Sequence, residues 1–512
     1  MTSQADVVFI DGEVHTMTDP DRTAEAVAVR DGEIVRVGDT YEIDFLTGVE
    51  TRVVNLDGRI LLPGFIDAHT HMQHLGQSLV HADLSDCSSL EDMLTRLSRD
   101  NDPDHEWILG FGYDESEWDG DGEFPNRSDL DSVSMDRPVA VFRIDMHTAS
   151  INSVALDHVG DRLPEEGVKR EHGEPTGVLV EAAVDELQSV IDPDRPEMRS
   201  VIESAASYAV SRGVTGVHDM VRRSTAPAVY RELDREGHLP LRVTINYWSD
   251  HLEAVTDLGL LPGSGSDTVQ MGAVKSFSDG SIGARTAKLE SPYADDPGET
   301  GEWVVHPSSI EEFVEEASAA DQQVAIHAIG DEAIREVLEL LESVASEGRR
   351  HRIEHAELLP DDLIDQFEAA DVVASVQPNF LKWARPGGLY DRRLGEQRRA
   401  SNNPFGAMAE AGIPLAFGSD CMPMDPLFGI HQVVTAPEPE QRLSVTDAVR
   451  AYTRGSAYAG FDEDRLGSIV PGKLADFVVL ERSPWEHQDS IADIDVAMTV
   501  VDGTVVFDRN RD

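Results

Sequence analysis

The sequence predicts an α/β protein: a (β/α)8 TIM-type barrel with a small β-sandwich domain built from both termini and an insertion after strand one. Short β-branched apolar runs alternate with amphipathic helical segments, which predicts the barrel. Strand-rich segments with Asp-Gly turns at both ends of the chain predict the sandwich. A long interval between the first two strand candidates predicts the insertion.

Eight apolar runs in the middle of the chain have the composition of parallel strands buried on both faces. They are FIDAHTH (65–71), GVTGVHD (213–219), LRVTINY (241–247), GAVKSFS (272–278), QVAIHAI (323–329), HRIEHAE (351–357), VASVQPN (373–379) and LAFGSDC (415–421). Helical segments separate most of them, for example 309–322 and 332–348. Eight such βα units are typical of a TIM-type barrel.

The predicted domain limits follow from the termini and the first interval. Asp-Gly pairs at 11–12, 31–32 and 502–503 lie between short strand candidates, as in β-hairpins. The interval after the first barrel strand is too long for a simple crossover, and its end, EMRSVIESAASYAVSRG, is predicted as the first barrel helix. We therefore expect a sandwich from 1–60 plus 465–512, a barrel from 61–464, and an insertion at about 76–195.

The charge of the chain excludes several classes of partner. The 42 Lys and Arg residues against 97 Asp and Glu residues give a formal net charge of −55. Nucleic acids and anionic membrane surfaces would repel such a protein, so neither is expected as a partner. Because the acidic residues are spread along the chain, we interpret them as a solvated, halophilic surface.

Cysteine use and hydropathy predict a cytoplasmic location. The two cysteines, Cys87 and Cys421, are far apart in sequence, which fits a reducing compartment. No run approaches 18 uncharged apolar residues, so no membrane span is expected. The first residues have neither the basic segment nor the apolar run of a signal peptide.

Polar residues at the carboxyl ends of the strand candidates predict a metal site, because the active sites of TIM-barrel enzymes lie at this end of the barrel. A single histidine there would more often be a hydrogen-bonded core residue, and His-x-His alone is a weak signal. The joint pattern is what indicates a metal, since only 18 histidines are spread over 512 residues. The predicted ligands are His69, His71, Lys275, His327, His355 and Asp420.

These residue types suit one kind of chemistry. Neutral imidazoles and a carboxylate bind Zn²⁺, Mn²⁺ or Fe²⁺, and we expect Zn²⁺. Lys275 is a poor ligand while protonated, but reaction of its amine with CO₂ would give a carbamate able to bridge two ions. A bound metal supplies hydroxide near neutral pH. Asp420 is then suited to take the proton of the attacking water and pass it to a leaving nitrogen.

Several motifs resemble those of the amidohydrolase superfamily. Their specific residues resemble the branch that includes N-substituted formamide deformylases (amidohydrolase family 3). The motifs are PGFIDAHTH, VKSFSDGSIGART, AIHAIGDEAI, HRIEHAELL, FGSD and the C-terminal VPGKLADFVVLE. The resemblance covers essentially the whole chain. It implies that His69, His71 and Asp420 bind the more buried metal, that His327 and His355 bind a second, and that carboxylated Lys275 bridges them. It also implies that Asp420 is the catalytic base.

Four further residues are predicted to contact the substrate. In the insertion, Arg143 and His147 either belong to a structural ion-pair network or bind substrate. Arg285 either clamps a carboxylate or pairs with a local acidic residue. Gln377, at the end of the seventh strand, faces the site if the register is correct.

The predicted function is metal-dependent hydrolysis of a non-peptide C–N bond in a small amide or formamide. The alternative is an aminohydrolase that deaminates a heterocycle, although such sites usually lack the strand-four lysine. A third interpretation is an inactive barrel that serves as a binding protein, against which the complete ligand set argues. Relatives in this family often form dimers, so a homodimer is a further expectation.

Overall fold

The computed structural model describes residues 4–99, 106–118, 123–344 and 348–511, and these contain an 8-stranded parallel sheet. The eight strands coincide with the eight predicted runs, so the predicted barrel is confirmed. They are β8 (Phe65–Thr70), β15 (Val214–Val221), β16 (Arg242–Trp248), β17 (Val269–Phe277), β18 (Val324–Ala328), β19 (Arg352–His355), β20 (Val373–Val376) and β21 (Leu415–Phe417), hydrogen-bonded in this order.

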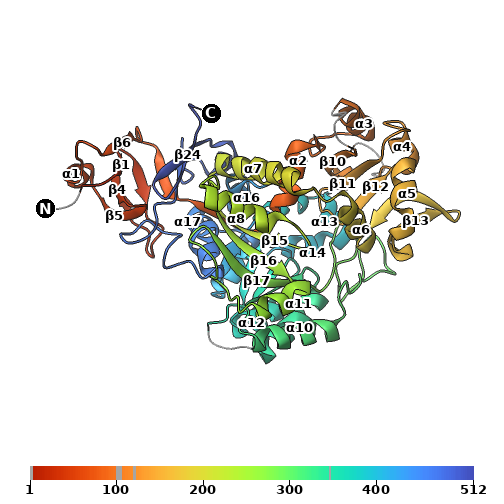
Figure 1. Cartoon of the computed structure of the whole chain (residues 1–512). Helices are drawn as coiled ribbons and strands as arrows, with labels where there is room; N and C mark the ends of the chain where they lie inside the picture. Colours follow the sequence, from red (N-terminus) through yellow and green to blue (C-terminus); the bar gives the residue numbers. More distant parts are fainter. Residues whose placement is uncertain (1–3, 100–105, 119–122, 345–347, 512) are drawn as a thin grey trace.

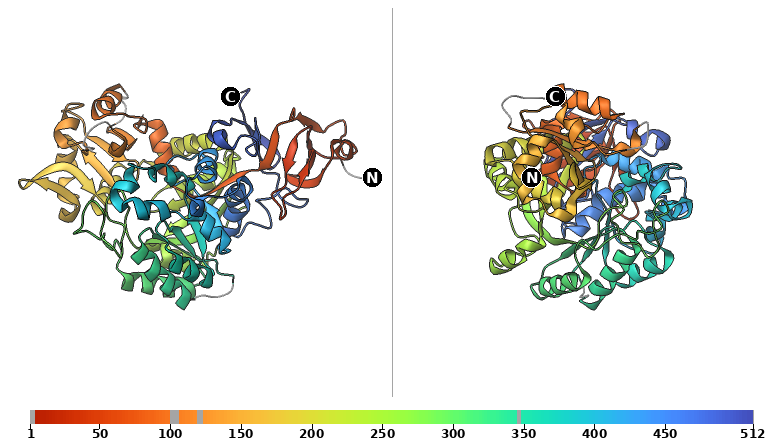
Figure 2. Two further views of the ribbon diagram at one scale, coloured as in Figure 1. Left: turned by 180° about the vertical axis from the view of Figure 1, so that it is seen from behind. Right: turned by 90° about the vertical axis from the view of Figure 1, so that its right-hand side faces the viewer.

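The sheet curls into a nearly closed barrel. The segment after β21 returns to β8, where the Asp420 amide donates to the His69 carbonyl at 2.8 Å. Strand β18 is buried at every position, as expected for a parallel strand covered by helices on one face and by the barrel interior on the other. Figure 1 and Figure 2 show the barrel in the middle of the molecule, with the sandwich and the insertion on opposite sides.

Helices cover the outside of the barrel, and α7 (Arg195–Ser211) shows why they form. Asp194 caps it by accepting a hydrogen bond from the Glu197 amide, and Met198, Val201, Ile202, Ala205 and Ala209 make its buried stripe. The other helices of this layer are α8 (Ala226–Glu236), α9 (Leu252–Asp257), α10 (Pro307–Ala319), α11 (Asp331–Ser343), α12 (Asp361–Ala369), α13 (Leu389–Leu394), α14 (Glu396–Ser401), α15 (Phe405–Glu410), α16 (Pro426–Val434), α17 (Val445–Arg450) and α18 (Ser456–Ala459).

Strands from both termini form two further sheets. One has β5 (Glu33–Gly38), β4 (Ala26–Arg30), β1 (Val7–Ile10) and β6 (Arg52–Asn55), with α1 (Thr40–Asp44) beside it. The other has β24 (Thr504–Asp508), β23 (Val496–Val501), β22 (Phe477–Leu480), β7 (Ile60–Pro63), β2 (Glu13–His15) and β3 (Thr23–Ala24). Phe9 and Phe477 meet edge to face at 5.5 Å within their shared core, so residues more than 450 positions apart stabilise one unit.

Two of the three predicted Asp-Gly hairpins form, and one does not. The pair at 31–32 joins the antiparallel strands β4 and β5, and the pair at 502–503 joins β23 and β24. The prediction at 11–12 is wrong, because β1 pairs with β4 and β6 whereas β2 pairs with β3 and β7. Both edges of β1 are already occupied, so the chain crosses at this turn from one sheet to the other.

The insertion after β8 has its own 6-stranded sheet. Its order is β13 (Val168–Glu171), β14 (Glu174–Val180), β12 (Thr148–Ile151), β11 (Val139–Arg143), β10 (Ile108–Tyr113) and β9 (Ala82–Asp83). The helices of this region are α2 (Met72–Val80), α3 (Leu90–Arg99), α4 (Arg127–Asp131), α5 (Ser153–Val159) and α6 (Ala182–Ile191). Within the described ranges, no helix has both the length and the apolar character needed to cross a bilayer.

Candidate metal centre

The structure brings the six predicted ligands to one end of the barrel. Each lies near or just beyond the carboxyl end of its strand: His69 and His71 at β8, Lys275 in β17, His327 in β18, His355 in β19 and Asp420 after β21. Parallel strands end on the same rim, so residues scattered over the sequence become neighbours.

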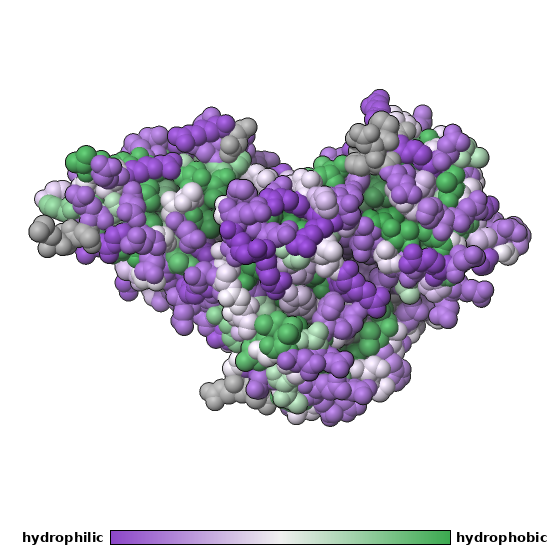
Figure 3. All heavy atoms as spheres, in the orientation of Figure 1, coloured by the Kyte–Doolittle hydropathy of each residue, from purple (hydrophilic) through white to green (hydrophobic). Residues whose placement is uncertain are grey.

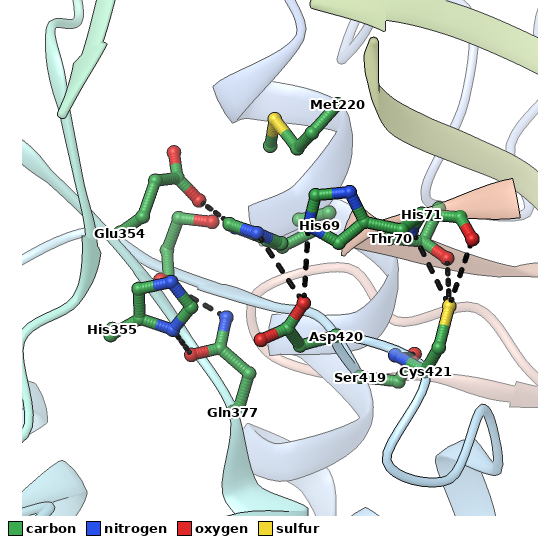
Figure 4. A network of polar contacts seen from close by, with 12 residues as sticks. His69, Thr70, His71, Met220, Glu354, His355, Gln377, Ser419, Asp420 and Cys421 are labelled. Carbon is green, nitrogen blue, oxygen red and sulfur yellow. Dashed lines mark hydrogen bonds and ion pairs between the residues drawn. The ribbon is translucent and has the colours of Figure 1, made fainter. Parts of the chain in front are cut away.

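Figure 4 shows His69, His71, His355 and Asp420 grouped together. The His355 ring lies 4.7 Å from the His69 ring and 4.5 Å from the His327 ring, measured between centroids. Asp420 Oδ1 lies 3.7 Å from His69 Nε2 and 3.4 Å from His71 Nε2. Side chains from four different strands therefore converge on one small volume.

Three of these residues form the most compact donor set among the described residues. One ligand atom each from His69, His71 and Asp420 lies within 4.8 Å of the others. His69 is buried, whereas His71 and Asp420 are partly exposed, so the set opens towards solvent on one side. Two imidazole nitrogens and one carboxylate oxygen that leave an open position are a donor set that fits a catalytic divalent metal ion.

Neighbouring groups orient three of the imidazoles. Hydrogen bonds occupy Nδ1 of His69, which faces Glu354 Oε2 at 2.6 Å, and Nδ1 of His355, which faces Gln377 Oε1 at 2.7 Å. In His327 the engaged atom is Nε2, which donates to the Gly280 carbonyl at 3.1 Å. Metal-binding histidines usually use their second nitrogen in this way, which fixes the tautomer and leaves the other nitrogen free as a ligand.

The imidazoles are held in the neutral form that binds metals. Burial lowers the pKa of His69, His71, His327 and His355 well below the usual value, and the nearby charge of Lys275 lowers each of them further. Protonation therefore competes weakly with metal binding at neutral pH.

Lys275 lies in an apolar wall beside the donor set. Its Nζ is 5.2 Å from the ring centre of Phe277 and 6.0 Å from that of Trp248. Burial lowers the pKa of the Lys275 amine, although the carboxylates of Glu354 and Asp420 act in the opposite direction. A lowered pKa increases the fraction of neutral amine, which is the form that reacts with CO₂.

A buried carboxylate that the sequence interpretation overlooked fixes the loop of Asp420. Asp67 accepts from the Ser419 hydroxyl at 2.5 Å and from the Ser419 amide at 2.9 Å. Asp420 itself has a positive φ of 52°, an uncommon conformation for a residue with a side chain. Asp67 therefore joins β8 to the loop after β21. An acidic residue inside a run predicted to be buried was the available signal.

The second overlooked group is Glu354 in β19, which is fully buried and contacts His69. Burial alone would raise the pKa of this carboxyl, but Arg352 and then Lys275 lower it below its usual value. The signal in the sequence was again a charged residue next to a predicted ligand, within the motif HRIEH.

The structure gives both predicted substrate-binding arginines carboxylate partners. Arg143 is buried, and it donates to Glu115 at 2.8 Å, Asp145 at 2.7 Å and Asp114 at 3.1 Å. In a separate pair, Arg285 binds both oxygens of Asp295, at 3.1 and 2.9 Å. These contacts agree with the ion-pair interpretation of each arginine, and a contact of either with substrate stays a prediction. Gln377, as described above, contacts His355.

His147 brings the insertion to the rim of the barrel. Its ring lies 6.2 Å from the His327 ring, and its Nδ1 is 2.8 Å from Glu181 Oε2. The other oxygen of Glu181 accepts from the Thr286 hydroxyl at 3.1 Å, in the loop after β17. Burial alone would lower the pKa of His147, but the Glu181 carboxylate, with Asp145 and Asp420, raises it to about 10.

A family model described as the amidohydrolase family matches residues 52–507. The chain belongs to the amidohydrolase family. The match spans the barrel, the insertion and the part of the sandwich from β6 onwards, including every residue of the candidate metal centre.

Similar proteins agree with this membership. The chain is 33% identical to Protein LONG AFTER FAR-RED 3 of Arabidopsis thaliana, over 98% of this chain and 92% of that protein. It is 28% identical to the N-substituted formamide deformylase of Arthrobacter pascens, over 99% of both chains. The crystal structure of an uncharacterized metal-dependent hydrolase from Pyrococcus furiosus is similar with a TM-score of 0.77 and 30% identity, covering 94% of this chain and 99% of that one.

Proposed function

We propose that this chain is a metal-dependent hydrolase that cleaves a non-peptide C–N bond in a small amide, such as an N-substituted formamide. The observation that carries the proposal is the convergence of His69, His71 and Asp420 within 4.8 Å. Membership of the amidohydrolase family and the similarity to a formamide deformylase support it.

The donor set suggests how metal would be held. His69, His71 and Asp420 would bind one Zn²⁺ ion, and His327 and His355 a second. Lys275 would bridge the two ions once its amine had become a carbamate. Ions held there would polarise the substrate carbonyl and lower the pKa of bound water to about 7.

The side chains around this set supply the remaining steps. Asp420 accepts a proton from the attacking water and later gives it to the leaving nitrogen. His147, oriented by Glu181, donates a hydrogen bond to an oxygen of the substrate. Of the four predicted substrate contacts we retain His147 in that role, because its ring lies 6.2 Å from that of His327 at the rim of the barrel. Gln377 contacts His355 and would act through it, whereas a substrate contact of Arg143 or Arg285 stays a prediction beside their ion pairs.

Metal analysis and product detection test this function together. The purified protein should contain a divalent metal, lose activity with a strong chelator and recover it with Zn²⁺. It should release formate and an amine from a series of N-alkyl and N-aryl formamides. Ammonia release from heterocyclic amines instead would favour the deaminase alternative. Metal-loaded protein that hydrolyses no amide in the series would contradict the proposed substrate class.

A further inference from the structure

An ion pair is buried directly beneath the candidate metal centre. Arg352 and Glu354 lie two residues apart in β19, so their side chains leave the strand on the same side. Both are 0% exposed, and Arg352 is the largest fully buried side chain among the described residues. Burying a charged pair is expensive, and apolar residues would fill this space at a lower cost.

The guanidinium of Arg352 connects four strands of the barrel. It donates to both oxygens of Glu354 at 2.8 and 3.1 Å, and to the Ser375 hydroxyl in β20 at 2.8 Å. It also donates to the Ala68 carbonyl in β8 at 2.7 Å and lies 3.0 Å from His218 Nδ1 in β15. All three nitrogens therefore have partners, and the position of the side chain is fixed from several directions.

Glu354 passes this restraint on to a predicted metal ligand. Its Oε2 accepts a hydrogen bond from Nη2 of Arg352. The same oxygen lies 2.6 Å from His69 Nδ1, and Figure 4 draws this contact between Glu354 and His69. Because a carboxylate only accepts hydrogen bonds, Nδ1 carries the proton and Nε2 is left towards Asp420. Arg352 also holds the carbonyl of Ala68, the residue before His69. Both the ring and the backbone of His69 are thus tied to one ion pair.

We propose that Glu354 and Arg352 are a positioning pair for the metal centre: Glu354 fixes the tautomer and direction of His69, and Arg352 fixes Glu354. The inference rests on the proposed function, because it requires that His69 bind a metal. It assigns a purpose to a pair that packing alone does not explain.

The affinity for Zn²⁺ tests the pair without any need for a substrate. The variant Glu354→Gln keeps the size of the side chain and removes its charge. We expect it to bind Zn²⁺ about 10- to 100-fold more weakly in competition with a chelating dye. In metal-free protein, nitrogen NMR should show His69 protonated at Nδ1 in the wild type and redistributed towards Nε2 in the variant; the resonance is assigned by its loss in His69→Gln.

Asp476→Asn is the matched control. Asp476 pairs in a buried site with Arg242, at 2.7 and 3.0 Å, but Arg242 begins β16 and so lies at the opposite end of the barrel. This variant should lose stability and keep the wild-type affinity for Zn²⁺. Arg352→Met/Glu354→Gln, which removes both charges together, serves where Glu354→Gln fails to fold, and it too should bind Zn²⁺ at least 10-fold more weakly.

The outcomes separate the two proposals. A wild-type protein that binds no Zn²⁺ overturns both the proposed function and this inference. A wild type that binds Zn²⁺ tightly, together with a folded Glu354 variant that binds it as tightly as Asp476→Asn does, overturns the inference alone. An unchanged His69 tautomer in that variant has the same consequence.

Discussion

Asp420 combines access to solvent with a rigid backbone. Its side chain is 14% exposed, whereas that of the neighbouring predicted ligand His69 is 1% exposed, so Asp420 is open to solvent as well as to His69. Its positive φ is held by the hydrogen bond to the His69 carbonyl and by the contacts of Ser419 with Asp67. Such strain is characteristic of residues whose position matters for function.

Substitution of a ligand should abolish activity and leave the barrel folded. His69→Ala and Asp420→Asn are expected to reduce turnover by at least about 100-fold, because each removes a proposed metal ligand and the second also removes the proposed proton acceptor. Turnover, bound metal and circular dichroism should be measured on the same samples. Wild-type turnover with metal still bound in both variants would show that the roles are assigned wrongly.

The proposed carbamate of Lys275 can be tested by replacing it with a small carboxylic acid. Lys275→Ala should lose most activity, because no carbamate can then bridge the ions. Formate, acetate or propionate added at high concentration should restore part of it by placing a carboxylate in the vacated space. Glu332→Ala is the control: Glu332 is half-exposed and pairs with Lys288, so its loss should leave activity unchanged and the added acids should have no effect. Absence of rescue at every acid concentration would leave the bridging role unsupported.

Near the metal centre, the segment after β21 approaches β8 closely. A Cβ atom on Gly418 would lie 2.5 Å from the His69 amide nitrogen and 2.8 Å from the His69 Cβ. Glycine is therefore required there by space, since the backbone and the buried side chain of His69 cannot move aside easily. The separation of these two elements sets the distance between His69 and Asp420.

Gly418→Ala should consequently weaken both stability and metal binding. We expect a loss of about 1–3 kcal/mol in the free energy of unfolding, typical of an overpacked core, with weaker binding of Zn²⁺. Gly160→Ala is a suitable control, since the nearest atom to its added Cβ would be 3.8 Å away. Denaturant titrations and chelator competition measure the two effects. Equal behaviour of the two variants would mean that the β8–β21 contact does not restrain the centre.

The whole molecule carries a net charge of −55 on a surface where hydrophilic residues predominate. Figure 3 shows them spread over the sandwich, the barrel and the insertion, with apolar residues in smaller groups. Many exposed arginines pair with acidic residues, for example Arg199 with Glu203 and Glu236, but the excess of acidic groups remains large. Mutual repulsion of these carboxylates opposes the compact state.

The midpoint of thermal unfolding should therefore rise by several degrees between dilute buffer and molar KCl, because salt screens this repulsion. Calorimetry at matched protein concentration measures the shift. Sucrose at equal osmolality is the control, since it does not screen charge and should not reproduce the whole effect. A midpoint that stays the same at both KCl concentrations would contradict the interpretation of the surface as halophilic.

The sequence by itself determined the eight barrel strands and the residues at their carboxyl ends. Hydrophobic periodicity is a local property, and runs such as that around His327 are too apolar to lie anywhere but in a buried parallel strand. The rule that such strands end on one rim then placed His69 beside His355 without knowledge of any contact. The Asp-Gly turn at 11–12 shows the limit of local signals, because strand pairing there depends on partners far along the chain.

Only the tertiary structure decided how the ligands are oriented and which charges are already paired. His69 and Glu354 are 285 positions apart, and their contact depends on the register of β8, β19 and their neighbours. In the same way, three carboxylates in the segments after β10 and β11 pair with Arg143, while Glu181 turns His147 towards the barrel. A sequence states which donors and charges exist, but hydrogen bonds are short and directional, so their partners are fixed only when the chain is folded.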